Sequence, residues 1–235
     1  MRFMILIMTL VLGAFLPAPV QATPFPSNSP EMLGICQAAI EKSEIENRLP
    51  KHLLRAISQA ESGRWHKKKQ EIIAWPWTVY AEGRGRYLKT KAAAIREVEQ
   101  LKAKGVRNID VGCMQVNLHY HPKAFANLNA ALDPAHNTQY AAKLLKSLQL
   151  KTRSWNMAVA HYHSQTPKYY IPYKRKVLNF WQAERRKSTN ARMAATRQQY
   201  RDKQAHLAAR KKEASLRRFT QNKPPVKLAD AKLSN

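Results

Sequence analysis

Apolar residues recur at intervals of three and four along most of the chain between residues 31 and 182. This spacing places apolar side chains on one face of an α-helix, whereas alternation of apolar and polar residues indicates a strand. Helices are therefore expected to begin near Pro30, Pro50, Thr90, Asp133 and Ser154. Extended structure is expected only at 72–80 and 106–116, where β-branched residues gather between glycines and polar turns.

The ends of these predicted helices carry residues that favour helix boundaries. Ser29-Pro30-Glu31 combines an N-cap with a first-turn proline and an acid, and Asp133-Pro134 repeats the first two features. Gly63 and Gly105 are expected to end the second and third helices, because glycine accepts the left-handed conformation common at helix ends. The sequence thus predicts a mainly α domain over 31–182 with a small extended lobe.

The character of the chain changes at Ala183. Apolar residues become sparse, and Lys, Arg, Gln and Ala dominate as far as Arg218, after which Pro224-Pro225 would break any helix. Such a segment has too little apolar surface to build a second core. Residues 183–235 are therefore predicted to be a basic C-terminal extension, either a solvated helix or a disordered arm.

Residues 1–22 have the three parts of a secretory signal. A positive residue precedes an apolar run from Phe3 to Val20, and the short side chains of Val20 and Ala22 suit a signal peptidase. An uncleaved membrane anchor is the alternative, but the run is short for a span and prolines interrupt its end. Cleavage after Ala22 and export to the periplasm or cell envelope are therefore expected.

The chain is strongly basic, with 41 Lys and Arg against 15 Asp and Glu and a formal net charge of +26. In a cytoplasmic protein this balance would point first to nucleic acid. An exported protein instead meets anionic wall polymers and lipid head groups, so no nucleic-acid partner is expected. The basic extension is expected to hold the protein at an anionic wall or membrane surface.

Two cysteines remain after the predicted cleavage, Cys36 and Cys113. An oxidising compartment permits a disulfide between them, and two buried free thiols are the alternative. The residues alone leave both states open.

A single glutamate stands at the end of the second predicted helix, whose inward face carries Leu53, Ile57 and Ala60. The C-terminal end of a helix is negative and apolar surroundings exclude water, so both disfavour an ionised carboxyl at Glu61. Its pKa is therefore expected to rise, as a general acid working near neutral pH requires. A solvated glutamate at a helix end is the ordinary alternative.

Three further segments carry side chains suited to a sugar-binding groove. In Gly112–Asn117, the glycine allows close approach of the backbone, and amide side chains follow on alternate positions. In 158–164, small residues precede Tyr162, whose phenol could hold a nearby carboxyl. Aromatic faces that either stack on pyranose rings or fill a core are offered by Trp75, Trp77 and Tyr80.

Together and in this order, these segments resemble the soluble lytic transglycosylase (SLT) domain, which has a lysozyme-like fold. The family pattern is a helix that ends in Glu-Ser, then Gly-Leu-Met-Gln-Ile/Val-Asn, then an Ala-x-x-x-Tyr-Asn helix. The corresponding segments here are Glu61-Ser62, Gly112-Cys-Met-Gln-Val-Asn117 and Ala158-x-x-x-Tyr162-His163. The resemblance spans roughly Leu33 to Tyr173, and three ordered motifs at sensible spacing argue against a chance match.

The resemblance implies that Glu61 is the single catalytic acid. Ser62 then matches a hydroxyl that helps to place glycan or carboxyl, and Tyr162 matches a tyrosine that hydrogen-bonds the catalytic carboxyl. The implied reaction cleaves the β-1,4 bond between MurNAc and GlcNAc of peptidoglycan, closes a 1,6-anhydro ring on MurNAc and needs no cofactor. General wall turnover and opening the wall for a secretion or flagellar apparatus both stay open as roles.

The resemblance also covers the groove. Met114 and Gln115 match groove-lining positions, and Asn117 matches a residue that supports the segment. Two departures from the family pattern stand out. Cys113 replaces the usual leucine, which keeps a small apolar filler or allows the bridge, and His163-Ser164 replaces Asn-x-Gly at the rim.

Two other functions stay open from the residues. A hydrolytic muramidase would need a second carboxylate near the cleft, for which Glu82 and Asp110 are the candidates. A non-catalytic wall-binding protein is the second, although a binder would not need both Glu61 and Tyr162.

The histidine pairs His119-x-His121 and His161-x-His163 raise the question of a metal site. Neither pair has the i, i+4 spacing that places two ligands on one helix face, and no acidic or thiol ligand follows at a recognisable distance. No metal site is therefore expected.

Overall fold

The computed structural model describes residues 30–221. The predicted signal peptide at 1–22, the N-cap at Ser29 and the Pro224-Pro225 pair lie outside these residues. Helices predominate in the described range, which confirms the predicted mainly α, lysozyme-like class. The helices are α1 (Pro30–Glu46), α2 (Leu53–Glu61), α3 (Lys91–Ala103), α4 (Leu128–Ala131), α5 (Pro134–Thr152), α6 (Trp155–His163) and α7 (Pro167–Gln221). The strands are β1 (Gly63–His66), β2 (Glu71–Ala74), β3 (Thr78–Ala81), β4 (Arg84–Tyr87), β5 (Asp110–Val111) and β6 (Val116–Asn117).

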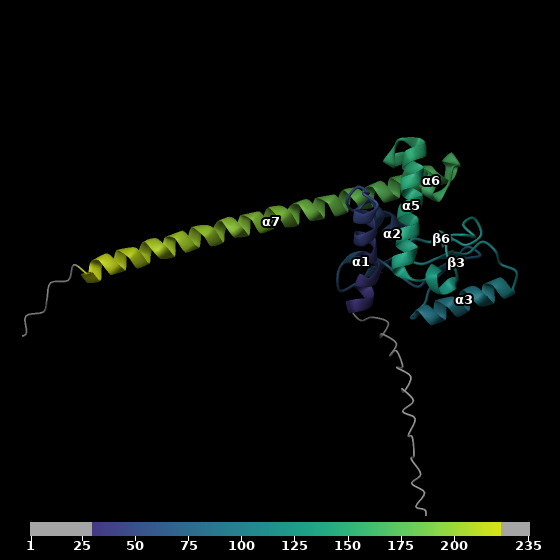
Figure 1. Ribbon diagram of the computed structural model, residues 1–235, viewed down its shortest axis with the longest axis horizontal. Helices are drawn as coiled ribbons and strands as arrows, with labels where there is room; N and C mark the ends of the chain where they lie inside the picture. The colour runs from purple at the N-terminus through teal and green to yellow at the C-terminus, as the bar shows by residue number, and fades with distance from the viewer. Residues whose placement is uncertain (1–29, 222–235) are drawn as a thin grey trace, which may run out of the picture.

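Two hydrophobic cores divide the domain. The first lies among α1, α2, α5, α6 and the beginning of α7, and Leu54, Ile57 and Leu145 are fully buried in it. The second lies between α3 and a four-stranded antiparallel sheet of order β4-β3-β5-β6, around Val79 and Val98. Figure 1 shows α3 and this sheet on one side of α5, with α1 and α2 on the other. The second core is therefore the small lobe that the β-branched segments predict.

Three of the predicted helix starts are capped by a side chain. Thr90, Asp133 and Ser154 each accept the backbone N–H group three positions further along, in α3, α5 and α6. Each bond satisfies one of the N–H groups that a helix start leaves without an internal partner. These starts agree with the sequence to within a residue.

The start of α2 differs from the prediction, because the helix begins at Leu53 and not at Pro50. A turn precedes it, and His52 in that turn has the left-handed φ of 69°. A glutamate of α1 supplies the cap instead: Glu44 Oε1 accepts the N–H of Leu54 at 2.8 Å, and Oε2 accepts the N–H of His52 at 3.0 Å. The negative side chain also suits the positive end of the helix.

The end of α2 is set by packing at Gly63. The helix stops at Glu61, Ser62 is the C-cap, and Gly63 opens β1. A Cβ atom at Gly63 would lie 2.2 Å from the backbone oxygen of Gln59, so no side chain fits there. The glycine thus lets the chain turn directly against the last turn of α2, which fixes the place of Glu61.

A disulfide joins Cys36 of α1 to Cys113 in the turn between β5 and β6. The two Cα atoms lie 5.8 Å apart, the sequence separation is 77 residues, and both side chains are buried in the first core. Of the two states that the sequence leaves open, the structure has the bridge. It ties α1 to the Gly112–Asn117 segment.

The last helix, α7, begins inside the domain and then leaves it. Tyr173 and Val177 are buried in the first core, where α7 packs against α2 and α6. Beyond Asn190 every described side chain is exposed, and Figure 1 shows this part of α7 projecting away from the domain. The extension predicted from Ala183 is thus a solvated helix as far as the structure describes it.

Contacts between α7 and the domain continue past the predicted boundary at 182. Glu184 pairs with Nε of Arg55 at 2.9 Å, and Lys187 Nζ lies 2.8 Å from a carboxyl oxygen of Glu71. The packed part of the chain therefore reaches residue 187. Within 30–221, no helix combines the length and the apolar character that crossing a bilayer requires.

Candidate active site

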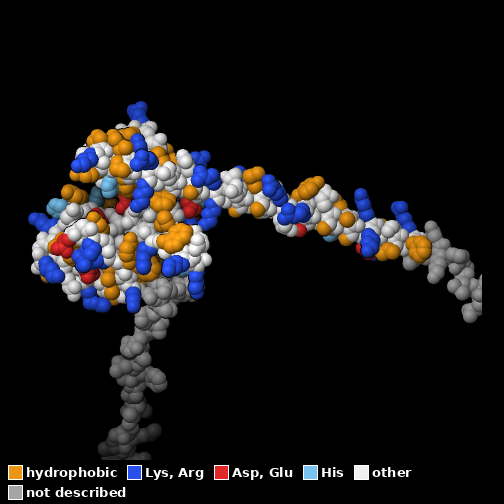
Figure 2. All heavy atoms as spheres, turned by 180° about the vertical axis from the view of Figure 1, so that it is seen from behind, with side chains coloured by type: hydrophobic (Ala, Val, Ile, Leu, Met, Phe, Trp, Pro, Cys, Tyr) orange, Lys and Arg blue, Asp and Glu red, His pale blue; other side chains and the backbone are white. Residues whose placement is uncertain are grey.

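A cleft of about 780 Å³ lies between the two cores. Its walls come from the end of α2, from β3, β5 and β6, from the segment after β6, and from the end of α6 with the residues that follow it. Histidine side chains line the indentation between the two parts of the domain in Figure 2. The lining residues are Glu61, Tyr80, Asn108, Asp110, Gln115, Val116, Asn117, Tyr120, His121, Leu144, His161, Tyr162, His163, Ser164 and Gln165.

Glu61 is placed in this cleft by the apolar face of α2. Leu53, Leu54 and Ile57 are fully buried, so the helix is held in the first core up to its last turn. Glu61 follows as the last residue, half-buried, with its side chain at the cleft. The hydroxyl of Tyr173 donates a hydrogen bond to Oε1 of Glu61 at 2.6 Å.

Burial raises the pKa of Glu61 from 4.5 to about 7. The Tyr173 hydrogen bond acts in the opposite direction, because it stabilises the ionised carboxyl, and the charge of Lys176 does so as well. The negative charge of Asp110 adds to the increase. A carboxyl with this pKa is protonated in a large share of molecules at neutral pH and can also ionise during a reaction, as a general acid and base must.

The structure corrects the role that the resemblance implies for Tyr162. Its hydroxyl donates to the backbone oxygen of Met114 at 2.9 Å, and the bond to Glu61 comes from Tyr173 in α7. Tyr162 lines the cleft beside Glu61, but α7 brings the second tyrosine directly onto the carboxyl. Burial and the charge of Glu61 raise the pKa of both phenols well above 10, so both remain donors.

We expect Tyr173→Phe to lower the cleavage rate by about tenfold, because the carboxyl loses the bond that orients it. Loss of that bond also removes a group that stabilises the carboxylate, so the alkaline limb of the pH–rate profile should shift to higher pH. Tyr162→Phe is the matched control, with an unshifted profile. Equal profiles for the two variants would contradict the assignment of this bond.

Ser62 does not reach the cleft, so of the two roles that the resemblance implies it does not place glycan, and support of the carboxyl stays open. Its side chain is fully buried, and its hydroxyl donates to the backbone oxygen of Cys113 at 2.7 Å. The residue after Glu61 therefore joins the end of α2 to the turn between β5 and β6. It fixes the cleft walls relative to each other without facing the substrate.

Met114 does not line the groove, which is the position that the resemblance implies for it. Its side chain is fully buried in the first core, because the turn after Gly112 directs it away from the cleft. Gln115 does line the cleft, with φ at 46°, and its Nε2 donates to the backbone oxygens of Thr78 and Gly112. Of the two predicted groove positions, the structure thus brings one to the cleft.

Asn117 lines the cleft and organises its rim. Its Nδ2 donates to Oδ1 of Asp110 at 2.7 Å, and its Oδ1 accepts the N–H groups of His119 and Tyr120, both at 2.9 Å. The side chain thus connects β5 to the segment after β6. This agrees with a residue that supports the segment.

Sequence reasoning missed Asn137 of α5. Its buried side chain accepts the N–H of Met114 at 2.9 Å and donates to the backbone oxygens of Val111 and Ala131. A Cβ atom at Gly112, where φ is +84°, would lie 2.5 Å from this amide. The backbone at Gly112 therefore approaches the side chain of Asn137 closely, as expected of a glycine. The available signal in the sequence was an asparagine among the apolar positions of an amphipathic helix.

The two candidate second carboxylates have different positions. Glu82 lies in the hairpin turn between β3 and β4, mostly exposed, and pairs with Arg86 at 3.0 Å. It does not line the cleft. Asp110 does line it, burial raises its pKa against the lowering effect of the Asn117 hydrogen bond, and its charge acts on Glu61.

The three aromatic residues considered for sugar contact also have different positions. Trp75 and Trp77 are buried in the second core. Tyr80 is 43% exposed and lines the cleft, so it is the one of the three that can contact a sugar ring there. The core alternative therefore holds for both tryptophans.

The histidines of the cleft do not gather into a metal site within 30–221, where no group of three or more metal-ligating side chains is found. His163, one of the departures from the family pattern, stacks on the ring of Tyr173 with centroids 4.3 Å apart. His121 is bonded through Nδ1 to the hydroxyl of Tyr140 at 2.9 Å. Both side chains therefore belong to the cleft walls.

Comparison with known proteins agrees with this arrangement. The family model described as the transglycosylase SLT domain matches residues 38–168, which include the end of α2, the Gly112–Asn117 segment and all of α6. Neither the search of curated proteins nor that of solved structures gave a match.

Proposed function

The chain belongs to the transglycosylase SLT domain family, whose members are lytic transglycosylases that act on peptidoglycan, and from this premise we propose a specific reaction. The protein cleaves the β-1,4 bond between MurNAc and GlcNAc and leaves 1,6-anhydro-MurNAc ends. Glu61 is its only general acid and base. One observation carries the proposal: Glu61 lies in the cleft with a pKa near 7 and is oriented by Tyr173.

In the first step, the protonated carboxyl of Glu61 donates its proton to the oxygen that links the two sugars. The C1–O bond of MurNAc breaks, and GlcNAc leaves with a new hydroxyl. The N-acetyl group of the substrate stabilises the oxocarbenium-like centre that develops at C1. The nearby charge of Asp110 favours the protonated form of Glu61 from which this step begins.

In the second step, the Glu61 carboxylate takes the proton from the C6 hydroxyl of MurNAc as its oxygen attacks C1. The 1,6-anhydro ring closes, and the proton from the C6 hydroxyl returns Glu61 to its protonated form. The hydrogen bond from Tyr173 stabilises the carboxylate between the two steps. No water and no cofactor enter the balance.

Product analysis tests this proposal. Purified peptidoglycan is digested to completion, and the fragments are separated and weighed by mass spectrometry. Anhydro ends are lighter by one water than reducing MurNAc ends, and the proposal predicts anhydro ends only. Reducing MurNAc ends without anhydro ends would overturn it, and intact strands would favour a wall-binding protein.

A second candidate function rests on the place of Asp110. A hydrolytic muramidase needs a carboxylate that activates water or attacks C1, and Asp110 shares the cleft with Glu61. The muramidase predicts that Asp110→Asn loses at least ~100-fold in rate and that wild-type products take up oxygen from labelled water. The transglycosylase predicts unlabelled products and, for Asp110→Asn, a lower Glu61 pKa with cleavage retained.

The place of action is also part of the proposal. The signal at 1–22 directs the chain to the periplasm or cell envelope, where peptidoglycan lies. The exposed part of α7 then acts as a tether to anionic wall or membrane surfaces. Figure 2 shows Lys and Arg side chains at intervals along this part of α7.

Deletion of 193–235 tests the tether. We expect retention on purified cell walls at low salt to fall by about tenfold, because the deleted segment carries much of the positive charge and its described side chains are all exposed. Cleavage of soluble glycan fragments should stay within about twofold. The difference in retention should disappear at high salt, where screening removes the attraction. Loss of retention and of soluble-fragment cleavage together would contradict the tether.

A further inference from the structure

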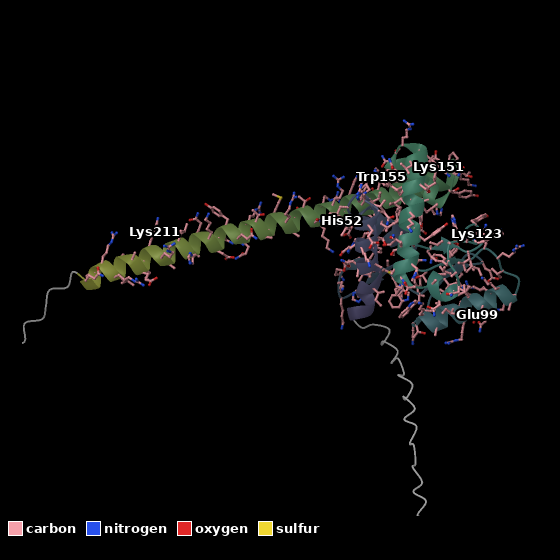
Figure 3. All side chains as sticks on the ribbon, viewed as in Figure 1. His52, Glu99, Lys123, Lys151, Trp155 and Lys211 are labelled. Carbon is pink, nitrogen blue, oxygen red and sulfur yellow. A yellow bond between two sulfur atoms is a disulfide. The ribbon has the colours of Figure 1, made fainter. Side chains whose placement is uncertain are left out.

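A second pocket, of about 650 Å³, lies where α7 leaves the domain. One wall is the turn before α2, with Lys51 and His52, and the other is one face of α7. Figure 3 places His52 at this junction, beside the beginning of the exposed arm. The cleft that holds Glu61 shares no residue with this pocket.

The α7 wall is built by regular helical spacing. Trp181, Arg185, Ser188 and Arg192 follow one another at intervals of four, three and four residues. These intervals keep side chains on one face of a helix, and Thr189 lies on the same face between the two arginines. The two arginines and two hydroxyls therefore share one face of α7 and line the pocket together with Lys51.

The positive charges at this pocket are not compensated by the protein. Within 30–221, Lys51, Arg185 and Arg192 form no ion pair with a carboxylate. The nearest acid of α7, Glu184, is already bound by Arg55 Nε at 2.9 Å and by Gln59 Nε2 at 2.9 Å. Three cations from two elements thus face one pocket, where their mutual repulsion favours an anion between them.

The walls of the pocket are held in place. Trp181 donates from Nε1 to the backbone oxygen of Lys51 at 2.9 Å, which links α7 to the turn. The guanidinium of Arg185 lies over the indole ring of Trp181, 5.4 Å from its centroid. The Trp181 hydrogen bond therefore fixes α7 against the turn that forms the other wall of the pocket.

We infer that this pocket binds a phosphate group. The lining offers three cationic groups and the hydroxyls of Ser188 and Thr189, and it contains no carboxylate. A phosphate has several acceptor oxygens and up to two negative charges, so it can accept from lysine, arginine and hydroxyl donors at the same time. The recognising chemistry is the same for a free phosphate and for one carried by a lipid head group.

Binding here is separate from catalysis. The pocket adjoins the first residues of α2 and Glu61 is the last, so the length of a nine-residue helix, about 13 Å, lies between them. The inference therefore does not depend on the reaction proposed for the cleft. Phosphate binding here gives the exposed part of α7 a specific anchoring point where it leaves the domain, in addition to general electrostatic attraction along its length.

Calorimetric titration of the whole protein with inorganic phosphate, at fixed ionic strength and neutral pH, tests the inference. Saturable binding is expected for the wild type, with affinity at least ~10-fold weaker in Arg192→Glu and in Lys51→Glu. The matched control is Arg197→Glu, the same charge change five residues further along α7 and about 140° around the helix. It should stay within about twofold of the wild type. No saturable binding, or equal weakening by Arg192→Glu and Arg197→Glu, would overturn the inference.

Vesicles identify the source of the phosphate. Sedimentation is compared for phosphatidylcholine vesicles with and without phosphatidic acid, using the same variants. A greater loss for Arg192→Glu than for Arg197→Glu assigns the pocket to a lipid phosphate. Equal losses on vesicles, with the pocket-specific loss for inorganic phosphate retained, assign it to a soluble phosphate.

Discussion

Glu61→Gln should lower the rate of peptidoglycan cleavage by roughly 10³-fold or more, because the amide can neither donate nor recover a proton. The substitution keeps the size of the side chain and an oxygen that can accept the Tyr173 hydrogen bond. The cleft should therefore still bind glycan. The measurement is the release of soluble fragments from purified peptidoglycan at pH 6–7 under single-turnover conditions.

Glu82→Gln is the matched control for this loss. It makes the same chemical change at a glutamate that lies in the β3–β4 turn and outside the cleft. Its cleavage rate should stay within about twofold of the wild type. Comparable cleavage rates for Glu61→Gln and the wild type would contradict a catalytic role of Glu61. A large loss of rate for Glu82→Gln would indicate that Glu82 is a second catalytic carboxylate.

The same Glu61→Gln variant should be more stable than the wild type above neutral pH. Folding raises the pKa of Glu61 from 4.5 to about 7, so the folded state holds this proton more tightly than the unfolded state. The stability that this bound proton adds to the folded state is full below pH 4.5 and is lost as pH rises through 7. At pH 8 the variant should gain up to about 3 kcal/mol in free energy of unfolding, with no such gain at pH 4. Urea denaturation at both values measures this.

Removal of the disulfide should have the largest effect on stability. The bridge closes a loop of 77 residues, and a cross-link of that span restricts the unfolded chain by about 4 kcal/mol. We expect the double variant Cys36→Ala/Cys113→Ala to lose about that much free energy of unfolding. Alanine avoids placing a hydroxyl in the buried site of the first core.

Two comparisons control this prediction. The wild type in excess reductant should approach the stability of the double variant, and reductant should not change the double variant itself. The bridge also holds the turn whose Cys113 oxygen accepts the Ser62 hydroxyl, so cleavage should be lost at a lower temperature in the double variant. Equal urea midpoints for oxidised wild type and double variant would contradict the prediction.

Local signals made most of the fold predictable. Thr90, Asp133 and Ser154 act through the next three residues of the chain, so their caps follow from sequence alone. The place of Glu61 at the end of an apolar helix was likewise visible in the spacing of its neighbours. The start of α2 was not, because its cap comes from Glu44 in the preceding helix.

The errors concern residues whose role depends on packing between distant elements. Tyr162 and Tyr173 are both phenols near the cleft, and only the way α7 crosses α2 decides which one meets Glu61. The start of α7 was not predicted, because Pro172 lies inside this helix and proline inside a helix normally indicates a break. Met114 turns into the core because the disulfide and Asn137 hold its segment, and Ser62 turns toward the same segment to bind the Cys113 oxygen.

The proposed reaction depends on one physical property, the retention of a proton by a carboxyl at neutral pH. Desolvation of Glu61 is the main cause, and Asp110 adds to it. Tyr173 and Lys176 act against it, which keeps the carboxylate accessible for the second step. A pKa near 7 thus suits both steps, the donation of a proton to the linking oxygen and the uptake of one from the C6 hydroxyl.

Carbon-13 NMR of the side-chain carboxyls in glutamate-labelled protein measures this property directly. The Glu61 signal is assigned by its absence from Glu61→Gln, and its shift is followed from pH 4 to pH 9. A titration midpoint near 7 is expected for Glu61. A midpoint near 4.5, the ordinary value for a solvated glutamate, would contradict it.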